Sequence, residues 1–316
     1  PRSFQTEGAR QVKNLARGPN PGNPLRHTFP GSLSAPPHLC LPNPQVYNRG
    51  VAKVGILGAG GMGAVHANAW SQIPGVEILA HDPHGATRLE GITDPGSVQA
   101  LLDACEIVDV CLPTDLHEGA AVAALEAGKH VFLEKPAART LAQAERIAEV
   151  AKSVDRVLGV GLVVRLFPEY ARANQTVRSG QIGKPAACRM RRGGPAPSGI
   201  DRWFRDPQRS GGILLDLAIH DFDWLRWTFG EPKRIYARHV RVEEGEYALS
   251  TLTFASGMVA HVESTWLDPS GFRTAFEVCG SEGMLEYDSR RAPSLRWSVP
   301  GGVRSEQNHF RADDPY

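Results

Sequence analysis

Residues 53–70 read KVGILGAGGMGAVHANAW, and this stretch indicates the fold of the first part of the chain. An apolar run typical of a short buried strand leads into glycines, and a helical run follows directly. Three of the glycines form G-x-G-x-x-G: the first allows a tight turn, the second lets the backbone approach a pyrophosphate, and the third lets helix pack on strand. Free N–H groups at the helix start favour phosphate oxygens. We therefore assign cofactor-binding roles to Gly58, Gly60, Gly61, Met62 and Gly63.

Asp82 completes this fingerprint. It follows the next apolar run, residues 76–80, and lies 19 residues after Gly63. A carboxylate at this point accepts hydrogen bonds from ribose hydroxyls and repels a 2′-phosphate, so the pattern predicts NAD in preference to NADP. The other interpretation is a glycine turn beside an unrelated surface aspartate.

Expected strands and helices alternate up to residue 163. A capping box formed by Thr140 and Gln143 starts the last helix of this part. The alternation indicates a doubly wound parallel sheet, so we expect residues 51–163 to form an α/β Rossmann domain. The expected strands are 53–57, 76–80, 107–112, 131–133 and 156–160, and the helices include 97–104, 117–127 and 140–153.

The rhythm changes after residue 163. One long helix is expected at Gly211–Phe229, ended by Gly230. Successive strands follow, which predicts that residues 164–316 form an α+β domain with an open, mostly antiparallel sheet. We expect the free face of this sheet to pair with a second copy of the chain in a homo-oligomer. The expected strands are 234–242, 247–254, 258–266, 273–278 and 284–287.

Composition excludes several classes of protein. The 316 residues include 35 Lys plus Arg and 34 Asp plus Glu, a net charge of +1, so nothing points to nucleic acid. Apolar runs are far shorter than the roughly 18 residues that a membrane helix needs. The cysteines are odd in number and form no C-x-x-C pair, which favours reduced thiols in the cytoplasm and indicates no metal site. They are Cys40, Cys105, Cys111, Cys188 and Cys279.

The first fifty residues differ from the rest. They hold nine of the 24 prolines and six basic residues against a single acid, without helical or strand periodicity. We expect residues 1–50 to be a disordered or spurious extension, with the protein proper starting near Val51.

Glu134-Lys135-Pro136 follows the strand 131–133, at the carboxyl edge of the expected sheet. Ligands of doubly wound folds bind at this edge. A lysine there can stabilise a developing alkoxide, and the alternative is a solvated loop lysine.

The expected helix Gly211–Phe229 is apolar almost all round, yet it carries a polar stripe. Asp216, His220 and Asp223 fall at i, i+4 and i+7. Burying such groups is costly unless each is paired. Two interpretations stay open: a satisfied Asp–His pair in the core, or a cleft-facing acid/base pair whose carboxylate tunes the imidazole.

Four motifs occur in order along the chain: VGILGAGGMGAVHA from Val54, CLPTDLH from Cys111, AGKHVFLEKP from Ala127 and WFRDPQRSGGILLDLAIHDFDWLRW from Trp203. Together they resemble the Gfo/Idh/MocA family, the group of glucose–fructose oxidoreductase and inositol dehydrogenase, over residues 51 to about 290. The resemblance implies that the Lys of EKP and the Asp and His of D-x-x-x-H are catalytic. In this chain they are Lys135, Asp216 and His220.

The resemblance also implies binding contacts. The Lys135–Pro136 peptide bond is expected to be cis, as X-Pro bonds at special turns sometimes are. For His66, a role near the cofactor and a simple packing role are both open. Contacts to nicotinamide and its ribose are implied for Pro113, Thr114, His117, Glu134 and Lys135, and contacts to substrate for Arg165, Trp203 and Arg205.

Three departures from the family pattern stand out. Only eleven residues separate Asp82 from Asp94, where relatives fit a helix and a strand, so we expect a thin wall on the adenine side. Leu162 stands where relatives often carry a polar side chain. The chain stops at Tyr316, where relatives continue into further helices, so we expect a truncated C-terminal domain.

The resemblance implies NAD-dependent oxidation of a secondary alcohol on a sugar, inositol or related polyol, in either direction. His220 would be the general base, Lys135 would stabilise the alkoxide, and Asp216 would orient His220 or the substrate hydroxyl. Two alternatives stay open: an enzyme that uses bound NAD transiently, as in glycoside cleavage, and an NAD-binding regulator. A regulator has no need of an acid/base set, which argues against it.

Overall fold

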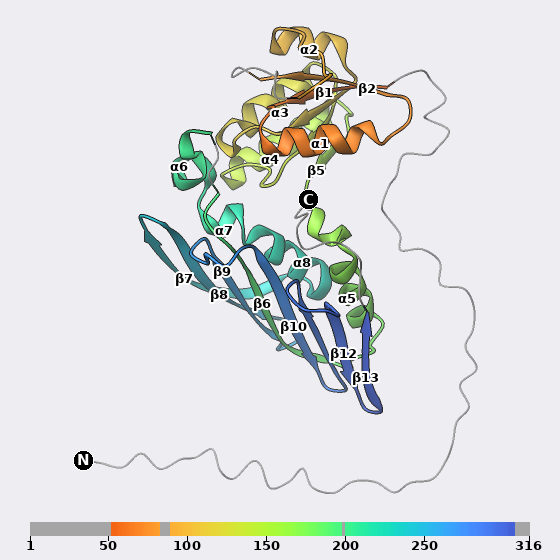
Figure 1. Ribbon diagram of the computed structural model, residues 1–316, viewed down its shortest axis with the longest axis vertical. Helices are drawn as coiled ribbons and strands as arrows, with labels where there is room; N and C mark the ends of the chain where they lie inside the picture. The colour runs from red at the N-terminus through yellow and green to blue at the C-terminus, as the bar shows by residue number, and fades with distance from the viewer. Residues whose placement is uncertain (1–51, 83–88, 198–199, 307–316) are drawn as a thin grey trace, which may run out of the picture. The chain divides into compact units, whose positions relative to one another are not determined.

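A five-stranded parallel sheet forms the first part of the computed structural model, which describes residues 52–82, 89–197 and 200–306. Every neighbouring pair of strands is parallel, which confirms the predicted doubly wound sheet (Figure 1). The expected extension at residues 1–50 and the chain end after residue 306 lie outside the described residues. The order is β2-β1-β3-β4-β5, with β1 (Ala52–Leu57), β2 (Val76–His81), β3 (Ile107–Val110), β4 (His130–Leu133) and β5 (Leu158–Val160).

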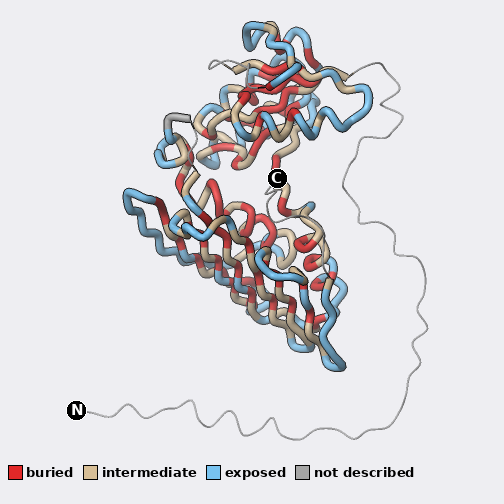
Figure 2. Tube along the Cα trace, viewed as in Figure 1, coloured by how far each residue is buried: buried red, intermediate tan, exposed pale blue. Residues whose placement is uncertain are grey.

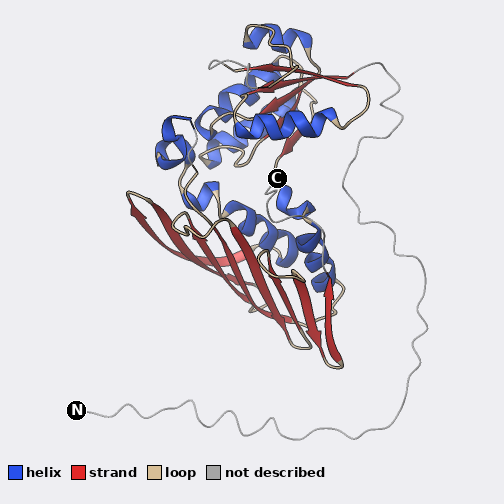
Figure 3. Cartoon of the chain, viewed as in Figure 1, coloured by secondary structure: helices blue, strands red, loops and turns tan. Residues whose placement is uncertain are grey.

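Helices connect these strands (Figure 3), and two of them, α2 and α4, begin at a side-chain cap. The Ser97 hydroxyl accepts the N–H of Ala100, and both bonds of the predicted Thr140–Gln143 capping box are present. Apolar faces of these helices pack against the sheet, so Leu125 and other side chains are fully buried. The helices are α1 (Gly61–Ser71), α2 (Val98–Ala104), α3 (His117–Glu126) and α4 (Leu141–Ser153).

The edge beyond β2 is short. The N–H of Ala80 donates to the carbonyl of Thr93, and Leu79 and Thr93 form a single parallel bridge. No helix lies between residues 89 and 97. Residues 89–97 therefore add one parallel bridge to this edge and no full strand.

An eight-stranded sheet forms the second part. Only the β6–β9 pair is parallel among its pairs, so the sheet is mostly antiparallel, as predicted. In strand order it is β13-β12-β11-β10-β6-β9-β8-β7. The strands are β6 (Pro185–Gly193), β7 (Pro232–Val242), β8 (Gly245–Phe254), β9 (Val259–Thr265), β10 (Arg273–Gly280), β11 (Met284–Asp288), β12 (Leu295–Val299) and β13 (Gly302–Glu306).

The sequence did not predict β6, β12 or β13. In β6 the residues facing the core are Cys188, Met190 and Arg192, with Arg189 exposed between them. A buried arginine in an inward position masks the apolar alternation on which strand prediction depends.

One face of this sheet is covered by α5 (Pro168–Arg178) and α8 (Ile219–Phe229), as Figure 1 shows. Their aromatic side chains Tyr170 and Trp224 pack on Phe276 of β10 with ring centroids 5.1 and 5.4 Å away. Figure 2 shows buried residues along the strands and along these two helices. This cluster is the largest apolar core of the described residues.

The prediction of a single helix at Gly211–Phe229 is wrong. The structure has α6 (Pro207–Ser210), α7 (Ile213–Asp216) and α8, with a break at residues 217–218. Gly211 and Gly212 have φ of +82° and +74°, which a right-handed helix excludes. Asp216 and His220 therefore lie on two separate helices, although the helix does end at Gly230 as predicted.

Candidate active site

The glycine loop between β1 and α1 has the geometry of a phosphate cradle. Gly58 has φ +100°, and a Cβ there would lie 2.7 Å from the carbonyl oxygen of Cys111. A Cβ on Gly63 would collide with the carbonyl of Gly58, so only glycine lets α1 start this close to β1. At Gly60 and Gly61 nothing lies within 4 Å of an added Cβ, which leaves the helix start open to an anion.

Asp82 closes this loop from the end of β2. Its Oδ2 accepts the N–H of Ala59 at 2.6 Å. The structure thus places the carboxylate directly beside the glycine turn, as the spacing predicted.

The residues that follow β3 form a turn, and the side chain of His117 contacts its backbone. The turn contains a 3-10 helix, Thr114–Leu116, and Thr114 is buried. The His117 ring nitrogens Nδ1 and Nε2 each lie 2.8 Å from a backbone carbonyl, of Pro136 and of Leu112. Burial lowers the pKa of His117 despite these two contacts. Its nitrogens therefore join two loops, a role that the family resemblance did not imply.

Lys135, in the loop after β4, is bonded to Asp216, the last residue of α7. The Lys135 Nζ donates to the carboxylate Oδ1 of Asp216 at 3.0 Å and to its carbonyl oxygen at 2.8 Å. Both side chains are largely shielded from solvent, with exposed fractions of 17% and 6%. The Lys135–Pro136 bond is cis, as the resemblance implied. The lysine is therefore held in place, which the loop-lysine interpretation did not anticipate.

His220 lies in the first turn of α8, in the same cavity. The side chain is buried, and its Nδ1 has no hydrogen-bond partner among the described residues. Burial lowers the pKa of His220 well below its ordinary value, and the cations Arg192 and Lys135 lower it further. At neutral pH the imidazole is therefore unprotonated, which is the form that a general base needs.

Arg192 is a member of the site that sequence reasoning missed. Its guanidinium Nη2 lies 2.8 Å from Asp221 Oδ1 and donates to the hydroxyl of Tyr170 at 3.1 Å. The Arg192 and Asp221 side chains are 3% and 1% exposed. A buried ion pair of this kind places a fixed positive charge beside His220, and it depends on a pairing between β6 and α8 that sequence spacing does not reveal.

His66 stands at the centre of a second polar network. Its Nδ1 lies 3.0 Å from both carboxylate oxygens of Asp109, and its Nε2 lies 3.1 Å from Glu134 Oε1. Burial alone would lower the pKa of His66, but the hydrogen bonds with Asp109, Cys111 and Glu134 outweigh it and raise the pKa to about 12. The other oxygen of Glu134 accepts the N–H of Lys135 at 3.0 Å. His66 is thus more than a packing residue, because it is linked through Glu134 to the loop of Lys135.

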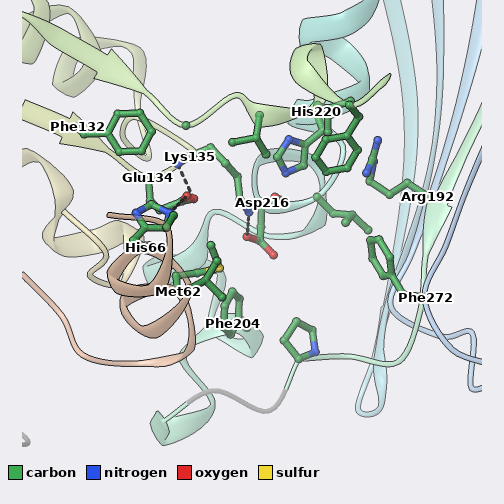
Figure 4. Close-up of a pocket in the computed structure, with 18 of the residues that line it drawn as sticks. Met62, His66, Phe132, Glu134, Lys135, Arg192, Phe204, Asp216, His220 and Phe272 are labelled. Carbon is green, nitrogen blue, oxygen red and sulfur yellow. Dashed lines mark hydrogen bonds and ion pairs between the residues drawn. The ribbon is translucent and has the colours of Figure 1, made fainter. Parts of the chain in front are cut away.

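A cavity of about 800 Å³ brings these groups together (Figure 4). Polar groups line one part of it, and apolar side chains such as Phe204 and Phe272 line the rest. In Figure 4 the Lys135 side chain reaches Asp216, with the His220 ring nearby. The polar lining residues are His66, Asp109, Glu134, Lys135, Arg192, Asp216 and His220.

The expected substrate residues do not line this cavity. Arg165 Nε donates to Asp223 Oδ2 at 2.6 Å, which accounts for the third polar residue of the expected stripe. Trp203 stacks on Phe204, and of these two residues only Phe204 lines the cavity. Arg205 donates to the carbonyl of Glu243 and is exposed.

Comparisons with known proteins agree with this architecture. Residues 52–162 match the family model described as an oxidoreductase family with an NAD-binding Rossmann fold, and residues 170–286 match the GFO/IDH/MocA C-terminal domain. The myo-inositol 2-dehydrogenase of Thermotoga maritima is 31% identical over 273 residues, 81% of this chain and 80% of that protein. The oxidoreductase YrbE of Bacillus subtilis, described as uncharacterized, is 27% identical over 274 residues, 81% of this chain and 79% of that one.

Among solved structures, a levoglucosan dehydrogenase in complex with NADH and levoglucosan superposes with a TM-score of 0.73. It is 25% identical, and the match covers 81% of this chain and 80% of that one. Both parts of the chain therefore have counterparts in dehydrogenases, in the same order.

Proposed function

The chain belongs to the GFO/IDH/MocA family of oxidoreductases, and on that premise we propose that it transfers hydride between NAD and a secondary alcohol carbon of an inositol, sugar or related polyol. The similar inositol dehydrogenase and levoglucosan dehydrogenase support this substrate class. The reaction is a dehydrogenation at a CH–OH group, and NAD supplies the hydride acceptor when it is bound.

The observation that carries the proposal is the joint placement of Lys135, Asp216 and His220. The Lys135 amine is fixed by two bonds to Asp216, and His220, whose Nδ1 has no hydrogen-bond partner among the described residues, lines the same cavity. His220 takes the hydroxyl proton as general base, which typically contributes roughly 10²–10⁴-fold to the rate. Lys135 stabilises the alkoxide that develops as the proton leaves. Asp216 orients Lys135 in this scheme.

The residues of the glycine loop fit a dinucleotide. Gly60 and Gly61 leave the N-terminus of α1 open, so the pyrophosphate would be held there by backbone N–H groups. Asp82, beside the loop, would accept bonds from the ribose hydroxyls, and its charge supports NAD over NADP. Pro113, Thr114 and Glu134 remain our candidates for nicotinamide and ribose contacts.

Three further expectations stay with this proposal. We place the division between a cofactor domain and a substrate domain at residues 163 and 164. We expect a homo-oligomer through the eight-stranded sheet, because its edge strand β7 exposes the large apolar side chains of Ile235, Tyr236 and Val240. We expect the cytoplasm, because the four described cysteines are free thiols. No helix in the described part of the chain is long and apolar enough to cross a membrane.

The test follows reduced-nicotinamide absorbance with the purified full chain. NAD and NADP are each supplied with a panel of inositols, aldoses and sugar acids. Turnover with at least one polyol and NAD supports the proposal. NAD binding with no net turnover on the whole panel would contradict it and would favour an enzyme that recycles bound NAD or a regulator. Glycoside cleavage without accumulation of NADH would separate those two.

A further inference from the structure

Three potential metal ligands converge at the carboxyl end of β3. His66 Nδ1 lies 3.0 Å from Asp109 Oδ1 and 3.2 Å from Cys111 Sγ. Cys111 Sγ lies 3.5 Å from the same carboxylate oxygen, which closes a triangle of three different donor atoms. Imidazole nitrogen, thiolate sulfur and carboxylate oxygen together are a donor set that suits zinc.

The triangle also has nearly the size of one face of a zinc tetrahedron. Zinc binds nitrogen or oxygen at about 2.0–2.2 Å and sulfur at about 2.3 Å, so neighbouring ligand atoms in a tetrahedron are about 3.3–3.6 Å apart. The three observed separations run from 3.0 to 3.5 Å, so shifts of a few tenths of an ångström would seat an ion. We propose that His66, Asp109 and Cys111 form a binding site for a zinc-like divalent cation.

Neighbouring groups orient two of these ligands. Glu134 Oε1 lies 3.1 Å from His66 Nε2, which is the carboxylate–histidine arrangement typical of metal-bound imidazoles (Figure 4). The indole of Trp70 donates to Asp109 Oδ2 at 2.7 Å. His66 Nδ1 lies 3.0 Å from both Asp109 oxygens, and of these two oxygens it is Oδ1 that also contacts Cys111 Sγ.

The cavity gives an ion access to the site. His66, Asp109 and Glu134 all line it, so an ion can reach the site from the cavity together with a water molecule as fourth ligand. Asp109 and Glu134 are 0% and 7% exposed, and two buried carboxylates near each other attract a cation.

The competing arrangement needs no metal. A doubly protonated His66 would bridge Asp109 and Glu134 and satisfy the same polar groups. The two arrangements differ at Cys111, whose sulfur binds the ion in one and only contacts His66 and Asp109 in the other. Cys111 is therefore the residue on which to test the proposal.

The experiment titrates the chelator-treated full chain with Co²⁺, without cofactor or substrate, and displaces the Co²⁺ with Zn²⁺. We expect one equivalent to give the visible bands of four-coordinate Co²⁺ and a thiolate charge-transfer band. Cys111→Ser should lose the charge-transfer band and bind more weakly, by at least the roughly 10- to 100-fold that loss of a ligand's hydrogen-bond partner costs. The matched control, Cys279→Ser on β10, should bind like the parent chain.

A six-coordinate Co²⁺ spectrum, or equal binding by Cys111→Ser, would overturn the proposal. If Cys111→Ser does not fold, protection of Cys111 from alkylation by Zn²⁺ in the unaltered chain is the deciding measurement, read by mass spectrometry. An alkylation rate that Zn²⁺ leaves unchanged would also overturn it. Because no turnover is measured, this outcome is independent of the dehydrogenase proposal.

Discussion

The amine of Lys135 is bonded twice to one residue, 2.8 Å from the carbonyl oxygen of Asp216 and 3.0 Å from its carboxylate. The two residues are 81 positions apart in the chain, and α7, which Asp216 ends, is only four residues long. Asp216 therefore positions the amine of Lys135 in this structure. Sequence reasoning had instead expected Asp216 to orient His220 or the substrate hydroxyl.

Lys135→Ala is expected to lower kcat by about 10²–10³-fold, because the charge that stabilises the alkoxide is lost. The dissociation constant for NAD should change much less, since the glycine loop and Asp82 hold the other end of the cofactor. Steady-state kinetics and calorimetric NAD titration measure the two effects. Lys152→Ala, at an exposed lysine in the last turn of α4, is the control. Full turnover by Lys135→Ala would remove this lysine from the mechanism.

His220 sets the acid limb of the pH profile. Burial first, and then Arg192 and Lys135, hold its pKa well below 6.5. The free enzyme already has a neutral base at pH 7, so kcat/KM should stay level from neutral pH down to 6.5 and fall only below it. His220→Ala should lose about 10²–10⁴-fold in kcat. An acid limb centred above pH 7 would show that another group is the base.

The same shift makes stability depend on pH. In the unfolded chain His220 binds its proton near pH 6.5, whereas the folded chain keeps it neutral to lower pH. The unfolded state therefore holds more protons below 6.5, and the free energy of unfolding falls as pH falls through this window. Urea unfolding between pH 4.5 and 7 should show a shallower slope for His220→Gln than for the parent chain.

Asp221→Ala is expected to destabilise the fold by about 3–5 kcal/mol, because it leaves the buried Arg192 guanidinium without its carboxylate. Urea unfolding measures this loss. Glu231→Ala breaks the exposed pair with Arg226 and should leave the midpoint unchanged, which makes it the matched control. Equal effects of the two variants would mean that burial of the Arg192 pair is unimportant.

Asp82→Ala should weaken NAD binding more than NADP binding, because the carboxylate attracts ribose hydroxyls and repels a 2′-phosphate. Some loss with both cofactors is expected, since Asp82 also accepts the N–H of Ala59 in the glycine turn. Fluorescence titration with NADH and NADPH gives the two dissociation constants. A uniform loss would mean that Asp82 acts on the loop alone.

Local patterns predicted the parts of the fold that depend on local chemistry. The glycine turn, the capping box at Thr140 and the end of α8 at Gly230 each depend on a few adjacent residues, and all are present. The break after Asp216 escaped prediction, because an apolar helical pattern continues through residues 217 and 218 while the backbone does not.

Pairings between distant segments could not be predicted from spacing. His66, Asp109 and Glu134 come from a helix, a strand and the loop after another strand, and nothing in their separation along the chain indicates that they meet. The ion pair between Arg192 and Asp221 requires strand β6, and this strand was not predicted because its arginines interrupt the apolar alternation. The candidate catalytic residues were found through a resemblance of motifs. The hydrogen-bond network that holds them could be identified only from the structure.

The parallel pairing of β6 with β9 has a consequence for how the site is assembled. Ala187 pairs with Val259, and on its other side β6 pairs with β10, so both neighbours of β6 arrive about 70 or more residues later in the chain. The loop closed by this pairing contains α7 and α8, and hence Asp216 and His220. Closing a loop of this length costs conformational entropy before its contacts stabilise anything. Asp216 and His220 therefore reach Lys135 only in a chain in which this long loop has closed.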